Sequence, residues 1–119
     1  MFDYEKWQIE HAKQQEAYKS FSITEDEKRA LPIGTHYFKA FFREYIEGEY
    51  AKQLIGIYLT LREAKKAARA FAKVELDELY NEELYIAEYE VTANNENFHG
   101  KFKRRFTNEE GMKFAEMIY

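Results

Sequence analysis

The residue types that most often carry catalysis or bind metals are few in this chain and stand far apart. His11, His36 and His99 have no partner at the spacing of a zinc site, and Ser20 and Ser22 lie outside the nucleophile motif Gly-x-Ser-x-Gly. The chain has no cysteine, which excludes disulfides, thiolate ligands and cysteine nucleophiles. Its glycines are scattered, so the sequence contains no glycine-rich phosphate loop. We therefore expect neither an enzyme nor a cofactor or metal site.

An acidic segment follows the centre of the chain. Its acidic residues are Glu75, Asp77, Glu78, Glu82 and Glu83. Clustered carboxylates can bind hard cations or act as acid and base, but this segment lacks the spacing and central glycine of a calcium loop. Near the C-terminus of a helix each exposed acid would oppose the macrodipole, at a cost of roughly 0.3–1 kcal/mol. We interpret the segment as a solvated helix end, with a surface for a basic partner as the alternative.

Basic residues form a stripe on the helix predicted just before this segment. Arg62, Lys66, Arg69 and Lys73 recur at i, i+4, i+7 and i+11, which places them on one helical face. Such a stripe can hold phosphates or an acidic protein surface. The simpler interpretation is a solvated face beside the buried one.

A second basic run, from Lys101 to Arg105, has acidic neighbours within its own predicted hairpin. We expect Glu88 to face Lys101 and Glu90 to face His99, because opposite charges on paired strands stabilise a sheet. This pairing accounts for much of the segregation of charge along the chain.

The most suggestive surface is one face of the first predicted hairpin. It carries aromatic and basic side chains in alternation, namely Tyr37, Lys39, Phe41, Arg43 and Tyr45, joined by Tyr58. Some single-stranded nucleic-acid binders stack bases and hold phosphates on such a face. The interpretation that we favour is that an N-terminal helix, over residues 3 to about 21, covers this face through Trp7 and Tyr18.

The elements that must position these residues follow one plan used twice. In residues 37–72 and again in 84–119, two alternating apolar runs joined by a turn lead into a Thr-x-x-Glu capping box. We predict strands over Tyr37–Ile46, Leu54–Leu59, Leu84–Val91 and Phe98–Phe106. Helices are predicted from Thr60 to about Tyr80 and from Asn108 onward, the second returning Phe114, Ala115 and Ile118 to the core.

Alternation also assigns the faces of the predicted sheet. Phe38, Ala40 and Phe42 should lie beside Ile55, Ile57 and Leu59 on an apolar inner face. On the second hairpin, Tyr85, Ala87, Tyr89 and Val91 should share a face with Phe98, Gly100 and Phe102. Gly48 suits a tight hairpin turn, whereas Gly56 and Gly100, inside predicted strands, indicate a bulge or a close backbone approach.

These elements predict an α+β fold: an N-terminal helix followed by ββα-ββα, with a four-stranded antiparallel sheet and two helices on one face. Residues 1–34 would form the N-terminal helix and a connecting segment, in which Thr24 caps a short helix and Pro32 and Gly34 mark a loop. Residues 35–119 would form the core of what is overall a single domain.

Composition limits the classes of function. The chain has 119 residues, 45% of them apolar, a net charge of −4 and no apolar run long enough to span a bilayer. Acidic residues near its N-terminus are unlike a signal peptide, so we expect a cytoplasmic protein without membrane contact. The phrase Thr60-Leu61-Arg62-Glu63-Ala64 between strand and helix resembles many small accessory proteins of phages and mobile elements, and no site residue is transferred from them. Segregated charge and abundant tyrosine favour an inhibitor or accessory role.

The leading hypothesis is therefore a small non-enzymatic module that binds another protein through charged and aromatic surface patches. The alternative is a nucleic-acid binder that uses the aromatic-basic face or the basic helix stripe, although a pI near 5.5 disfavours it. Pairing of two copies through the aromatic face would make the protein a homodimer.

Overall fold

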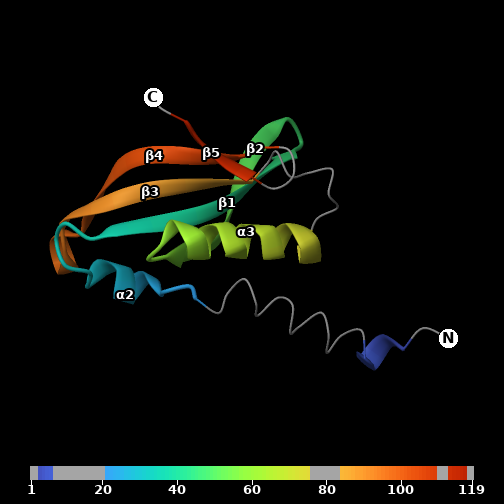
Figure 1. Cartoon of the computed structure of the whole chain (residues 1–119), viewed down its shortest axis with the longest axis horizontal. Coiled ribbons are helices and arrows are strands. Elements are labelled where there is room, and N and C mark those ends of the chain that lie inside the picture. Colours follow the sequence, from blue (N-terminus) through green and yellow to red (C-terminus); the bar gives the residue numbers. More distant parts are fainter. Residues whose placement is uncertain (1–2, 7–20, 76–83, 110–112, 118–119) are drawn as a thin grey trace.

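An antiparallel sheet forms the centre of the computed structural model, which describes residues 3–6, 21–75, 84–109 and 113–117 (Figure 1). Its strands are β1 (His36–Ile46), β2 (Glu49–Tyr58), β3 (Leu84–Ala93), β4 (His99–Glu109) and β5 (Lys113–Met117). Their order across the sheet is β2-β1-β3-β4-β5, and every neighbouring pair is antiparallel. The four predicted strands are present, which confirms an antiparallel α+β architecture, and β5 adds a fifth.

The first hairpin turns tightly between β1 and β2. Its two loop residues, Glu47 and Gly48, have φ angles of 49° and 87°. Two consecutive positive φ values match the twist of the flanking strands, and glycine adopts them at no steric cost. The predicted turn at Gly48 is thus confirmed.

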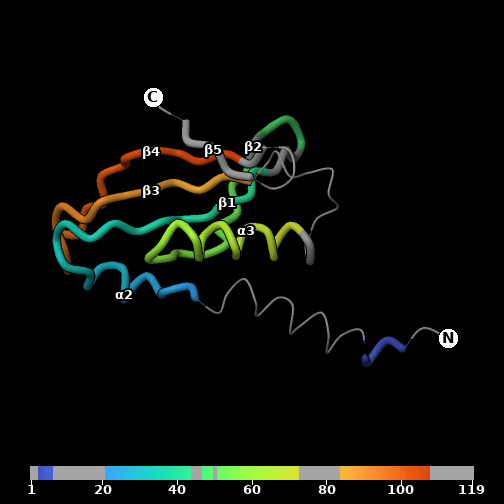
Figure 2. Tube along the Cα trace, in the orientation of Figure 1, coloured from blue at the N-terminus to red at the C-terminus, as the bar shows by residue number. Residues whose placement is uncertain are grey.

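The helix α3 (Leu61–Glu75) covers one face of the sheet and carries the chain from β2, past β1, to β3 (Figures 1 and 2). It begins after Thr60, whose Oγ1 accepts a hydrogen bond from the Glu63 backbone N–H at 3.1 Å. Its buried side chains are mostly alanines (Ala64, Ala67, Ala68, Phe71 and Ala72), which let the helix axis approach the strands closely. Leu76 and Leu79, predicted on the same stripe, lie outside the described residues.

The second predicted helix does not form. From Asn108 the chain continues β4 to Glu109 and then pairs back on β4 as β5, with Asn108 opposite Phe114 and Thr107 opposite Ala115. A helix over this segment would contain Gly111, which costs about 1 kcal/mol in a helical interior. The Thr107 capping box therefore lies in a strand, which corrects the predicted ββα-ββα order and leaves α3 alone against the inner face in the described part of the chain.

Extra residues in the strands correct the assignment of faces. Ile55 in β2 has no partner in β1, because Gly56 pairs with Ala40 and Leu54 with Phe41. This bulge turns Ile57 away from the helix, where it joins Tyr37 and Val91, and brings Tyr58 into the core beneath α3. Leu59, predicted to be buried, is 44% exposed.

The segment before the sheet runs across the face that α3 leaves uncovered. In it, α2 (Glu25–Arg29) begins with the predicted capping box, Thr24 and Glu27 exchanging side chain to backbone hydrogen bonds at 3.1 Å. On one side of α2, Ile23 N donates to Ile57 O at 2.8 Å; on the other, Gly34 N donates to Val91 O at 2.8 Å. Residues 4–6 are helical, but the rest of the predicted N-terminal helix, including Trp7 and Tyr18, lies outside the described residues.

Candidate functional site

We call the side of the sheet opposite α3 the outer face, and one end of it is closed by the chain itself. Tyr37, 2% exposed, lies there with Ile57 and Val91, beneath Ile23 and Leu31 from the segment around α2. Burial, helped by Tyr89 and then Glu25, raises the pKa of Tyr37 to about 12. A Cβ at Gly100 would overlap the Tyr37 hydroxyl, which confirms the close approach predicted for this glycine.

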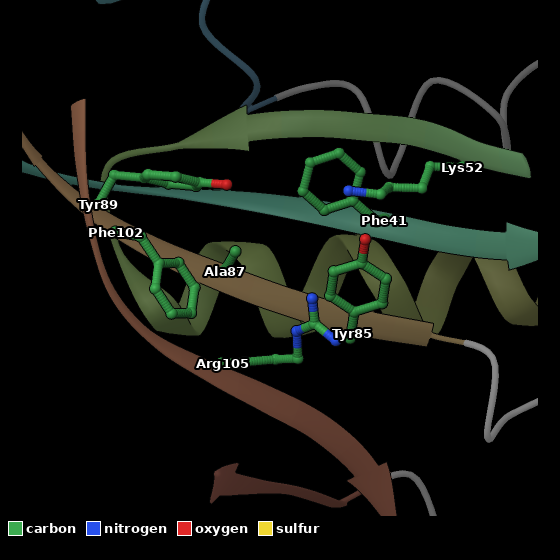
Figure 3. A pocket seen from close by; sticks show the side chains of 7 residues that line it. All are labelled: Phe41, Lys52, Tyr85, Ala87, Tyr89, Phe102 and Arg105. Atoms are coloured by element: carbon green, nitrogen blue, oxygen red, sulfur yellow. The ribbon is translucent and has the colours of Figure 1, made fainter. Parts of the chain in front are cut away.

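Beyond the segment around α2, the outer face opens into a hollow of about 450 Å³ (Figure 3). We call this site the hollow; its lining comes from β1 to β4 and consists of Phe41, Lys52, Tyr85, Ala87, Tyr89, Phe102 and Arg105. Aromatic and basic side chains surround one alanine, and no acidic side chain is among the residues that line it.

The hollow exists because a short residue stands in the middle of its floor. Ala87 lies on β3 between Tyr85 and Tyr89, which point to the same face two residues away on either side. Across the sheet Ala87 is flanked by Lys39 on β1 and Arg105 on β4. Arg105 reaches this face because a bulge leaves Lys103 unpaired and shifts the alternation of β4 by one.

Two pairs of rings form the aromatic walls. Phe41 stacks on Tyr85 with centroids 5.1 Å apart, and Phe102 meets Tyr89 edge-on at 5.9 Å. Tyr85 is 7% exposed, whereas Phe102 is 42% exposed. Tyr89 also stacks on Tyr37 at 5.3 Å, so the rings of the open and covered ends are in contact.

Cations lie against these walls. The Arg105 guanidinium is 4.3 Å from the centroid of Tyr85, and the ammonium groups of Lys39 and Lys52 lie 5.4 Å and 5.7 Å from Tyr89 and Phe41. Burial lowers the pKa of Lys39, and the neighbouring charge of Lys28 lowers it further, against the opposing effect of Glu25. Three cationic side chains, Lys39, Lys52 and Arg105, therefore lie against the rings of this face.

A separate polar cluster on the helix side of the sheet satisfies its own groups. Glu88, 7% exposed, accepts from His36 Nδ1 at 2.7 Å and pairs with Arg104 Nε at 3.3 Å, while His36 Nε2 lies 3.2 Å from Glu90. The predicted partners of the two acids are corrected, because Glu88 pairs in register with Arg104 and Glu90 with Lys101. The cluster explains how a carboxylate is buried in the sheet.

The other residues proposed from sequence are placed as follows. On α3, Arg62, Lys66 and Arg69 are exposed, and Lys66 lies 5.4 Å from the Phe21 ring. Phe41 lines the hollow, Lys39 lies beside it, and Arg43 is exposed on β1. Tyr37 and Tyr58 are buried, so neither is a contact residue in this conformation. The side chains of Tyr45, Lys73 and Glu75, and residues Asp77, Glu78, Glu82 and Glu83, lie outside the described part.

Most of the hollow was not proposed as a site from sequence. The alternation of β3 and β4 correctly groups Tyr85, Ala87 and Tyr89 with Phe102. It does not reveal that β3 lies beside β1, which brings Tyr85 against Phe41. Nor does it reveal the bulge that turns Arg105 to this face. The sequence offered one indication of the hollow: on one face of the predicted strand, the small Ala87 stands between the large Tyr85 and Tyr89.

Comparisons of the chain with models of known protein families, with curated proteins and with solved structures found no match. In the described ranges, no three histidine or acidic side chains are grouped closely enough to hold a metal ion. Of the helices in those ranges, none is both long enough and apolar enough to cross a membrane. The hollow is therefore interpreted from its own chemistry.

Proposed function

We propose that this protein is a non-enzymatic, cytoplasmic binding module that recognises another protein through the hollow. The observation that carries the proposal is a concave, acid-free site in which exposed aromatic surface and three cations lie together. Aromatic and arginine side chains are enriched at the energetic centres of protein interfaces. Segregated charge and abundant tyrosine support an accessory or inhibitor role, and the lack of cysteine fits a reducing compartment.

Selection from a library of displayed random peptides tests the proposal. We expect the enriched peptides to bind the wild-type protein and to lose most of their affinity for a Phe102→Ala, Arg105→Gln double variant. The matched control is Ala51→Leu with Lys101→Gln, two exposed strand positions that do not line the hollow. Enriched peptides that bind both double variants equally would place the interface elsewhere.

Single-stranded nucleic acid is the second candidate, because Phe102 offers a half-exposed ring close to Arg105. The other rings are poorly placed for stacking bases, since Phe41 and Tyr85 already stack on each other and Tyr37 is buried. A gel-shift titration with single-stranded and double-stranded oligonucleotides at low salt decides between the candidates. We expect no complex tighter than the nonspecific range of roughly 10⁻⁴–10⁻⁶ M. A tight, salt-sensitive single-strand complex would favour nucleic acid.

A further inference from the structure

The hollow is specific enough to indicate the chemistry of its partner. Building on the proposed protein-binding function, we infer that its occupant is an acidic segment that inserts one aromatic side chain into the hollow, against the exposed ring of Phe102. The carboxylates of that segment face the surrounding cations, Arg105, Lys52 and Lys39. The inference rests on the volume of the hollow, on the exposed surface of Phe102 and on charge complementarity.

The space lies between the side chains that line the hollow, and its volume is about 450 Å³. Its floor is covered, since Ala87 is 2% exposed and Tyr85 is 7% exposed, so the apolar surface within reach of a partner is the 42% exposed ring of Phe102. Arg105 lies over Tyr85, and Lys39 lies over Tyr89, the ring that Phe102 meets edge-on.

The walls favour a flat, apolar insert. An inserted phenylalanine, tyrosine or tryptophan would bury the exposed Phe102 surface and contact its ring edge-on or face-on. Such side chains lose little rotamer freedom on binding. The favourable free energy of burying their surface is therefore offset by only a small loss of conformational entropy.

The charges select acidic neighbours for that aromatic residue. The lining contains no carboxylate to repel them, and its two cationic side chains, Lys52 and Arg105, attract them. A phosphate backbone offers the same charge, but it would bring successive bases to rings that are already stacked on each other. An acidic peptide uses the charge and needs only one opening for a ring.

Fluorescence anisotropy with a labelled synthetic peptide tests this inference directly. The probe is a short peptide in which one tryptophan is flanked by glutamates; its controls replace the tryptophan by alanine or all the glutamates by glutamine. We expect each control peptide to bind at least about tenfold more weakly, the loss typical of removing an interface hot spot. The protein variants Phe102→Ala and Arg105→Gln should each weaken binding of the probe by about tenfold. Ala51→Leu and Lys101→Gln should leave its affinity unchanged.

An NMR titration of the wild-type protein makes the test independent of variant folding. Resonances of Ala87, Phe102 and Arg105 should shift with the glutamate–tryptophan probe, whereas those of Ala51 should not. If peptides from the display selection bind at the hollow but neither tryptophan nor glutamate matters, the inference is overturned while the protein-binding function stands. If no peptide binds and oligonucleotides shift these resonances, both are overturned.

Discussion

The two faces of the sheet are filled by different means. On the inner face, α3 lays an alanine-rich surface against Phe38, Ala40, Phe42 and their neighbours, so the chain closes its own core. On the outer face, the segment around α2 covers Tyr37 and Val91 but leaves the hollow open beside them. Under α3 the inner face is packed with aliphatic and aromatic side chains, and its buried Glu88 is paired with His36 and Arg104, whereas the outer face has rings with cations against them. This difference separates residues that hold the fold from residues available to a partner.

The largest expected effect on stability comes from comparing one phenylalanine of the core under α3 with one phenylalanine of the outer face. Phe71 on α3 is 3% exposed and contacts Phe42 at 5.8 Å, so Phe71→Ala should cost about 3–5 kcal/mol of unfolding free energy. Phe102→Ala on the outer face should cost less than about 1 kcal/mol, because that ring is half exposed already. Urea denaturation of both variants measures the difference, and equal losses would contradict the division.

The covered end of the outer face can be examined through pH. The pKa of Tyr37 in the folded protein, about 12, lies above its ordinary value of 10, so the folded state keeps a proton that the unfolded chain releases. The stabilisation is complete below about pH 10 and is lost as the pH rises toward 12. From about pH 9 to about pH 11 the loss should be about 1.4 kcal/mol. Denaturation at both pH values should show this loss in the wild type and a smaller one in Tyr37→Phe; equal losses would mean that Tyr37 is not shielded.

The helix α3, which covers the inner face, is stabilised at its N-terminus by the Thr60 cap. Removing the hydrogen bond from Glu63 N by Thr60→Ala should cost about 1 kcal/mol. The same change at Thr107, whose capping-box sequence lies in β4, should cost less than about 0.5 kcal/mol because no helix depends on it. Thermal unfolding of the pair measures both effects. A larger loss of unfolding free energy for Thr107→Ala than for Thr60→Ala would contradict this prediction.

The smallest effect on stability is expected within the hollow itself. Lys52 is exposed on β2, so Lys52→Gln should change the unfolding free energy by less than about 0.5 kcal/mol. The same substitution should weaken binding of the glutamate–tryptophan probe and reduce the dependence of that binding on salt. Anisotropy titrations at two salt concentrations, with Lys101→Gln as the control, measure this. Unchanged affinity would remove Lys52 from the site.

Much of the architecture was accessible from local sequence. Alternation identified the four strands, Gly48 identified the hairpin turn, and the boxes at Thr24 and Thr60 identified the helix starts that the structure confirms. The box at Thr107 gave the wrong element, because a capping signal fixes where a helix would begin but not whether it forms. A competing strand partner was available in β4, and pairing with it gave β5 backbone hydrogen bonds along one edge.

The candidate site was less accessible, since it depends on which residues come together. Phe41 and Lys39 were proposed from sequence, but Tyr58 was assigned to the wrong face and Arg105 was not grouped with the aromatic residues. Both differences come from single extra residues, Ile55 in β2 and Lys103 in β4, each of which reverses the alternation beyond it. The alternation of apolar and polar residues does not by itself predict the position of such a bulge.

The sequence by itself determined the residues that build this protein: alternating strands, an alanine-striped helix, abundant rings and cations, and no cysteine. Those properties are local, because they depend on composition and on spacing along the chain. The tertiary structure decided that β3 lies against β1, that two bulges turn Ile57 and Arg105 to the outer face, and that Ala87 becomes the floor of the hollow. Strand order and register depend on contacts between segments that are far apart in the sequence. The free energies of those contacts cannot be inferred from any one short segment.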